Sequence, residues 1–167
     1  TGLVLQHSVL DNAVLPRLAN YRGTKRLPVV SWRRARRGIG AILSGLNVKH
    51  GGLADRVSTL SGGNQQKIVI GRWFGTPLRL FLLDEPTRGV DVRSKAEIHR
   101  LCNRLAAEGT GILFATSDLE ELLMLASRVV VMANGVLTLD APNRAVTRQS
   151  IIDATFQDPF RRPAPGA

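Results

Sequence analysis

Three short segments combine residue types and spacings that can do chemistry on an anion. The first is LSGGNQQK, residues 60–67, in which Ser61 precedes a helix expected over residues 62–74. Gly62 and Gly63 remove side chains where free backbone N–H groups point outward, and the helix dipole adds positive charge there. Such a helix start suits a terminal phosphate. A serine-capped helix after a Gly-Gly turn is the plainer interpretation, and this segment alone would favour it.

The second segment is LFLLDE, residues 80–85. Residues 78–83 lack polar alternation and predict a strand buried on both faces. Asp84 and Glu85 then lie at the carboxyl end of that strand, where α/β proteins bind ligands. Asp84 can hold Mg²⁺ directly or through water, and Glu85 can orient or deprotonate an attacking water. A plain strand end is the alternative.

The third segment is TRGVD, residues 87–91. Gly89 permits a tight reversal, and Asp91 can cap a helix expected over residues 92–108, before Gly109. Taken alone, this segment predicts only a turn.

The elements that must position these segments alternate between strand and helix. A second apolar strand is expected over residues 111–116, followed by Ser117, by Asp118 as a helix cap, and by a helix to about residue 127. Residues 129–133 predict a third strand, and Asn134-Gly135 predicts a hairpin. A last short helix is expected around residues 150–156. The fold class is therefore α/β, a mainly parallel sheet flanked by helices, with an antiparallel hairpin near the C-terminus.

Composition narrows the function classes. The 167 residues carry a formal charge of +10, which points to an anionic partner such as nucleotide, nucleic acid or phospholipid. The single cysteine, Cys102, excludes an internal disulfide scaffold, and no apolar stretch is long enough to span a membrane. No signal-peptide pattern begins the chain, which predicts a cytoplasmic protein.

The positive charge is concentrated at one end of the chain. Residues 1–54 hold nine Lys and Arg and one Asp, a formal +8, and the run from Arg33 to Arg37 contributes four of the arginines. A solvated helix face is the plainer interpretation of this run, and contact with an anionic surface is the functional one. Only Tyr21 and Trp32 lie nearby as aromatics, which argues against a platform that stacks nucleic-acid bases.

Together the three segments resemble the ATP-binding cassette (ABC) ATPases, a P-loop NTPase-like family. LSGGNQQK is similar to the family's signature sequence, LLDEP at 82–86 to its Walker B strand, and RGVD at 88–91 to its D-loop. DEPTRGVDV at 84–92, KAEIH at 95–99 and SDLEELL at 117–123 resemble the second cassette of ribose-, galactose- and xylose-type sugar importers. Residues 2–16 resemble the stretch after that cassette's Q-loop.

The resemblance implies two sets of nucleotide contacts. Ser61, Gly62, Gly63 and Asn64 would close over the γ-phosphate of ATP held by a partner cassette, and Asp91 in the D-loop would help couple the two sites. This partner cassette would be part of the same polypeptide or a second copy.

The resemblance also assigns the catalytic groups. Asp84 would hold Mg²⁺, and Glu85 would serve a second ATP as the catalytic carboxylate. Ser117 occupies the position of the family's switch histidine, where losing one phosphate contact costs about 2 to 4 kcal/mol of transition-state stabilisation. Whether this site hydrolyses ATP is therefore open.

Two parts of the family's nucleotide site are absent from the 167 residues. The sequence contains no Gly-Lys pair, so it has no P-loop, and it begins too late to contain the Q-loop glutamine. The expected organisation is a helical-subdomain region over 1–60, the signature helix, Walker B, D-loop and switch region over 61–157, and a frayed tail over 158–167.

The resulting functional hypothesis is a partial ATPase subunit of a carbohydrate-import ABC transporter. It would lie peripherally on the cytoplasmic face of the bacterial inner membrane, bound to permease subunits and served indirectly by a sugar-binding protein. A non-hydrolysing piece that only dimerises or docks on the permease is one alternative. A basic nucleic-acid-binding protein of ABC type is the other.

Overall fold

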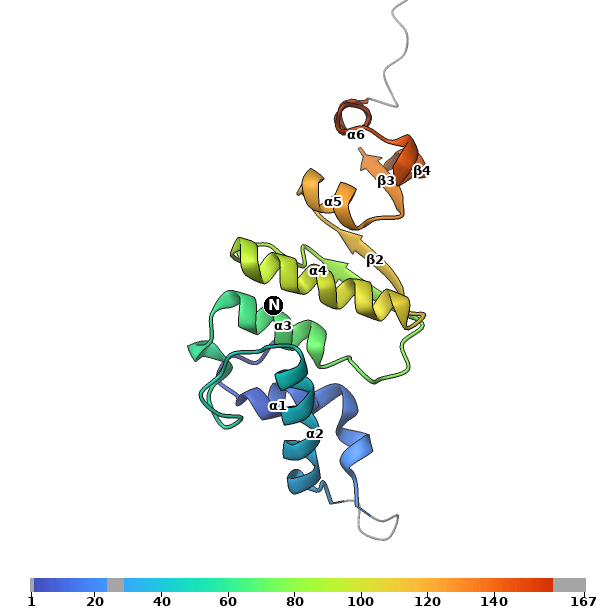
Figure 1. The fold of residues 1–167 in the computed structure, drawn as a ribbon. Coiled ribbons are helices and arrows are strands. Elements are labelled where there is room, and N and C mark those ends of the chain that lie inside the picture. The colour runs from blue at the N-terminus through green and yellow to red at the C-terminus, as the bar shows by residue number, and fades with distance from the viewer. Residues whose placement is uncertain (1, 24–28, 158–167) are drawn as a thin grey trace, which may run out of the picture. The chain divides into compact units, whose positions relative to one another are not determined.

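The computed structural model describes residues 2–23 and 29–157. Its helices and strands are α1 (Val9–Val14), α2 (Trp32–Gly45), α3 (Gly62–Gly71), β1 (Leu80–Asp84), α4 (Val92–Ala107), β2 (Gly111–Ala115), α5 (Leu119–Leu125), β3 (Arg128–Ala133), β4 (Val136–Pro142) and α6 (Arg148–Phe156), with short 3₁₀ turns at Leu15–Tyr21, Val57–Thr59 and Asn143–Ala145 (Figure 1). None of the described helices is long and apolar enough to cross a membrane.

The chain forms two compact units, Thr1–Ala115 and Thr116–Ala167. The organisation expected from the sequence, with segments 1–60, 61–157 and 158–167, stays a prediction. The tail at 158–167 lies outside the described residues.

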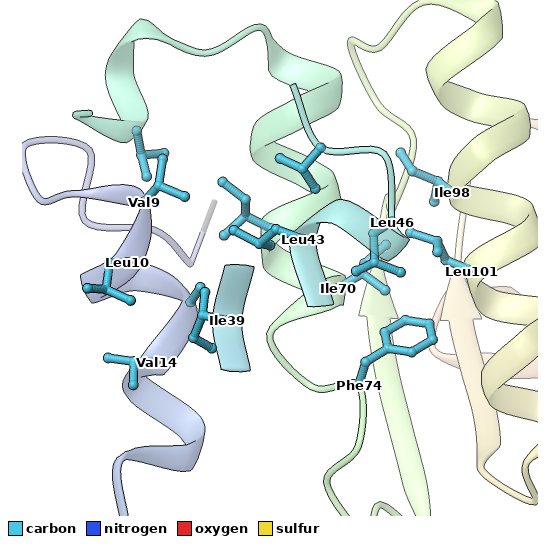
Figure 2. Packing of buried hydrophobic residues seen from close by; sticks show 14 of the residues in the cluster. Val9, Leu10, Val14, Ile39, Leu43, Leu46, Ile70, Phe74, Ile98 and Leu101 are labelled. Carbon is cyan, nitrogen blue, oxygen red and sulfur yellow. The ribbon is translucent and has the colours of Figure 1, made fainter. Parts of the chain in front are cut away.

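The first unit has a helical core. Leu43 and Ile39 of α2, Val9 of α1, and Ile70 of α3 pack into one buried cluster, which Ile98 of α4 extends (Figure 2). The periodic apolar residues 39, 42, 43 and 46 predict the buried face of a helix here, and Ile39, Leu43 and Leu46 are buried. Cys102 of α4 is also buried.

A buried arginine ends α3. The Arg17 guanidinium donates hydrogen bonds to the Arg72 carbonyl at 2.6 and 3.2 Å and to the Phe74 carbonyl. Carbonyls at a helix carboxyl end need such partners. The helix expected to run to residue 74 therefore stops at Gly71, and residues 72–74 form tighter turns.

The parallel sheet is covered on one face only. β1 and β2 pair in parallel, with Asp84 opposite Ala115, as expected. The prediction that the first strand is buried on both faces is wrong, because Leu80 and Leu82 are 57% and 64% exposed. The opposite face, with Phe81 and Leu83, packs on the core. Nothing within the described residues of this unit covers the leucine face.

The second unit is a hairpin with two helices. β3 and β4 pair antiparallel and form a two-stranded sheet of their own. Asn134 and Gly135 both have positive φ, 51° and 79°, as a two-residue turn requires. Val129 and Val131 of β3 pack on Ile151 of α6 and on partly buried leucines of α5.

Candidate functional site

The start of α3 carries the first predicted group. Ser61 is the N-cap residue, but its side chain makes no capping hydrogen bond to the helix. Its hydroxyl oxygen instead accepts from the side-chain nitrogen Nδ2 of Asn64 at 2.9 Å. Asn64 Oδ1 in turn accepts from the backbone N–H of Lys49 at 2.8 Å. The first N–H groups of α3 thus lack the cap that the sequence led us to expect. Ser61 and Gly62 are exposed, so this helix start can receive an anion.

Gly63 holds α3 against the start of α4. A Cβ built on Gly63 would overlap the Ser94 hydroxyl and lie 2.5 Å from the Ser94 Cβ, so only glycine allows this approach. At Gly62 the nearest atom to such a Cβ is the Gly89 carbonyl oxygen, at 3.6 Å. The segments 60–67 and 87–91 are therefore neighbours in space, and their two helices begin side by side.

A buried lysine fixes the same pair of helices one turn further on. Lys67 Nζ lies 2.7 Å from Glu97 Oε2 on α4 and donates to the Asn47 carbonyl at 2.8 Å. The Lys67 side chain is 4% exposed and that of Glu97 18%. The hydrogen bond from Lys67 is the main cause that lowers the pKa of Glu97. The carboxylate is thereby kept charged opposite the ammonium.

Asp91 caps α4 as predicted. Its carboxylate accepts from the Ser94 N–H at 2.9 Å and from the Ser94 hydroxyl at 2.7 Å. The hydrogen bond from the Ser94 backbone, followed by that from its hydroxyl, lowers the pKa of Asp91. Ser94 therefore contacts Gly63 and Asp91 together, which joins the start of α3 to the turn before α4.

Asp84 and Glu85 lie at the carboxyl end of β1. Asp84 is exposed and Glu85 is half-buried. Glu85 has a φ of 46°, a region that non-glycine residues rarely adopt, and its N–H donates to the Ala115 carbonyl at 2.9 Å. The Arg88 N–H donates back to the Glu85 carbonyl at 3.2 Å. An unusual backbone conformation held by such bonds is a feature of functional sites.

Ser117 belongs to the second compact unit. It is exposed and lies between β2 and Asp118, whose carboxylate accepts from the N–H groups of Glu120 and Glu121 to start α5. Nearby, the buried Glu121 accepts from the Thr116 hydroxyl at 2.6 Å. The cap at Asp118 is confirmed, and α5 ends at Leu125, two residues before the expected end.

The described residues contain no group of three or more metal-ligating side chains that could hold a cation. Asp84 fits a magnesium site as one exposed carboxylate ligand at the edge of the sheet, because hard cations prefer carboxylate oxygens. The remaining ligands would come from nucleotide, from water or from residues outside this set.

A family model described as "ABC transporter" matches residues 1–88, more than half of the chain. The chain belongs to the ABC transporter family. We refer below to residues 60–67, 82–86 and 88–91 as the ABC signature, Walker B segment and D-loop, because they resemble those motifs of the family.

Curated ABC relatives match most of the chain. The ribose import ATP-binding protein RbsA 2 of Streptomyces avermitilis is 44% identical over 160 residues, covering 92% of this chain and 30% of the relative. RbsA 2 of Rubrobacter xylanophilus is 42% identical over 153 residues, covering 92% of this chain and 29% of the relative. The chain thus spans about a third or less of the length of these relatives.

Solved ABC cassettes share the fold. A dimeric post-hydrolysis ATP-binding cassette bound to ADP and phosphate matches with a TM-score of 0.70 at 23% identity, covering 85% of this chain and 59% of that one. An inward-facing transporter of putative metal-chelate type matches with a TM-score of 0.74 at 23% identity, covering 93% and 60%. The α/β ABC-cassette fold expected from the sequence is confirmed.

Sequence reasoning missed the residues that hold the ABC signature and D-loop together. Ser94, Glu97 and the ammonium of Lys67 were given no role. A lysine directly before the apolar residues 68–70 was the available signal, because a buried lysine needs an anionic partner.

Proposed function

We propose that this chain supplies the signature, Walker B and D-loop part of an ATP-hydrolysing cassette in a carbohydrate importer. The observation that carries the proposal is the 44% identity, over 92% of the chain, with a ribose import ATP-binding protein. The geometry supports it, since the three motifs lie on elements of one compact unit, with the signature beside the D-loop.

The signature would bind the γ-phosphate of ATP held on a partner cassette. Ser61 is exposed, and within residues 2–23 and 29–157 its hydroxyl donates no hydrogen bond, so it can donate one to a phosphate oxygen. The N–H groups at the start of α3 and the helix dipole would add to this contact. Asn64 supports it by holding the Ser61 hydroxyl in place.

Glu85 would act on the attacking water of a second ATP. A half-buried carboxylate at the strand end can accept a hydrogen bond from that water and orient it in line with the γ-phosphate. The two backbone hydrogen bonds described above hold Glu85 in its unusual conformation, which limits its freedom before substrate arrives. Ser117 occupies the position of the family's switch residue, and its hydroxyl would donate a hydrogen bond to the γ-phosphate.

Asp84 would hold the magnesium ion of the nucleotide. When bound, Mg²⁺ neutralises charge that develops on the phosphate oxygens. Asp91 would hold the D-loop at the cassette interface through its cap on α4. Closure over one ATP would then change the geometry of the other site.

The P-loop that this site needs would come from another segment of the polypeptide, because the 167 residues contain none. The partners are a second cassette and membrane permease subunits, with a sugar-binding protein acting through the permease. The chain would lie peripherally on the cytoplasmic face of the bacterial inner membrane.

Sugar uptake tests this proposal. The matching segment of the Streptomyces avermitilis ribose import protein is exchanged for this chain, and ribose uptake is measured in cells that lack the native protein. We expect uptake with the exchanged segment and none with Glu85→Gln. Absence of uptake, with normal expression and membrane recovery of the exchange protein, would overturn the proposal.

The purified 167-residue chain gives a second readout. We expect no hydrolysis of Mg-ATP by this chain alone, because it lacks the lysine that binds the β- and γ-phosphates. Measurable turnover that disappears in Glu85→Gln would refute the requirement for a P-loop from elsewhere.

A further inference from the structure

The strongest unassigned feature is the beginning of α2, which we call the basic end of α2 and define as Val29 together with residues 32–37. Of residues 32–37, only Ala35 is buried. Arg33, Arg34, Arg36 and Arg37 are all exposed. The ABC motifs lie on other elements, so the proposed ATPase function does not use this surface.

The described part of the chain offers the four arginines no ion-pair partner. Within residues 2–23 and 29–157, no carboxylate lies within ion-pair distance of any of the four. Arg33 and Arg37 are four residues apart on the helix, so they are neighbours and repel each other. The beginning of α2 therefore carries like charges that an anion from outside would neutralise.

Three of the arginines surround a hollow. Arg33, Arg34 and Arg37 line it together with Tyr21. The Tyr21 hydroxyl lies against Gly38, where an added Cβ would come within 2.6 Å of it. The hollow is thus lined by three arginines and a tyrosine, residue types whose donors match phosphate oxygens.

Apolar side chains at the same end favour lipid over a fully polar anion. Val29 is 68% exposed and Trp32 is 46% exposed, and the Trp32 N–H donates to the Val30 carbonyl, which keeps this stretch compact. Tryptophan beside basic residues is typical of segments that lie at the headgroup level of a bilayer. Stacking aromatics for nucleic-acid bases are limited to Tyr21 and Trp32.

We propose that the basic end of α2 docks on anionic phospholipid headgroups at a membrane surface. The guanidinium groups bind headgroup phosphates, and Trp32 and Val29 enter the interfacial layer. This inference goes beyond the proposed function, and vesicle binding needs no ATP hydrolysis, so either proposal can fail alone.

Vesicle co-sedimentation tests the docking surface. The probes are vesicles of phosphatidylcholine alone and of an equimolar mixture with phosphatidylglycerol. We expect binding to the mixed vesicles only. The variant with Gln at positions 33, 34, 36 and 37 should bind at least about tenfold more weakly, since each basic residue near an anionic surface contributes roughly fivefold.

A matched variant controls for net charge. Arg79, Arg100, Arg144 and Arg148 are exposed elsewhere in the chain, and changing these four to Gln removes the same charge. This control should keep binding within about fivefold of the parent chain. Circular dichroism checks that both variants keep their helix content, which is expected because glutamine is a good helix former.

Three results would overturn the proposal. One is equal loss of binding in the two variants. Another is equal binding to neutral vesicles, which would indicate the exposed leucine face of the sheet instead. The third is displacement from mixed vesicles by duplex RNA that binds more tightly at the same salt, which would favour nucleic acid.

A single-tryptophan chain reports on insertion. The sequence has two tryptophans, so Trp73→Phe leaves Trp32 alone. We expect the Trp32 emission to shift to shorter wavelength with mixed vesicles and to be quenched by lipids with brominated acyl chains. Vesicle binding without either change would contradict docking through this end of α2.

Discussion

At the scale of residues, the site depends on contacts that fix two helix starts together. Gly63 permits the approach of α3 to α4, Ser94 contacts both Gly63 and Asp91, and Lys67 binds Glu97. None of these contacts involves nucleotide. These contacts position the groups that would bind nucleotide. Losing a contact should therefore affect both the stability of the chain and the geometry of the signature.

Gly63→Ala tests the close approach. We expect its free energy of unfolding to fall by about 1 to 3 kcal/mol, because the new Cβ overlaps Ser94 and the helices must separate. Gly62→Ala is the matched control and should change it by less than about 0.5 kcal/mol, since its Cβ would make an ordinary contact. Urea unfolding measures both. Equal effects of the two variants would contradict the account.

Glu97→Gln tests the buried ion pair. It should lower the free energy of unfolding by about 1 to 3 kcal/mol at neutral pH, because Lys67 loses its charged partner. Glu108→Gln, a change of the same charge at an exposed position just after α4, is the control and should have little effect.

The pH dependence of the stability lost in Glu97→Gln gives a sharper readout. The pKa of Glu97 is lowered in the folded chain, chiefly by the Lys67 hydrogen bond, so its stabilising contribution is present above the ordinary glutamate pKa of about 4.3. The contribution disappears as pH falls through the lower folded value. The difference in unfolding free energy between the parent chain and Glu97→Gln should therefore shrink between pH 6 and pH 3. A difference that stays constant over this pH range would contradict a stabilising role for the charged Glu97 carboxylate.

At the scale of elements, the sequence predicts what local signals determine. Asp91 and Gly109 bracket α4, and Asn134-Gly135 makes the hairpin, because caps and positive-φ turns depend on a few adjacent residues. The burial of β1 was predicted wrongly, since an apolar run does not reveal which neighbour covers each face. The signature's contact with Ser94 was equally invisible, because it depends on how two helices pack.

The leucine face of the β1–β2 sheet makes a prediction at this scale. Leu80, Leu82 and Leu113 are all more than half exposed, and within the described residues β1 and β2 pair only with each other. An apolar patch beside open strand edges promotes association. We expect the isolated chain to self-associate, and the double variant Leu82→Gln with Leu113→Gln to be less associated at the same concentration. Sedimentation velocity measures this.

Two exposed apolar residues outside that sheet provide the control. Val92→Gln with Met124→Gln removes apolar surface that is 86% and 72% exposed, respectively. This control should associate like the parent chain. If it reduces association as much as the sheet variant does, general surface hydrophobicity explains the effect and the leucine face does not.

At the scale of the whole molecule, the positive charge and the ATPase motifs lie in different parts of the sequence. Residues 1–54 hold the formal +8, while the signature, Walker B and D-loop lie in residues 60–91. Phosphate contacts in the proposed site come from backbone N–H groups and a serine, so the charge is not needed to explain nucleotide binding. The exposed arginines of α2 instead suit the anionic membrane surface that we propose as their partner.

The central claim is that these residues form the catalytic half of an ABC ATPase site, with Glu85 as its carboxylate. The direct measurement is steady-state Mg-ATP hydrolysis by the purified exchange protein, in which this chain replaces the matching segment of the ribose import relative. We predict hydrolysis by the exchange protein, and a loss of at least about a hundredfold in Glu85→Gln with ATP binding retained. Hydrolysis that is equal in the two proteins would contradict the claim.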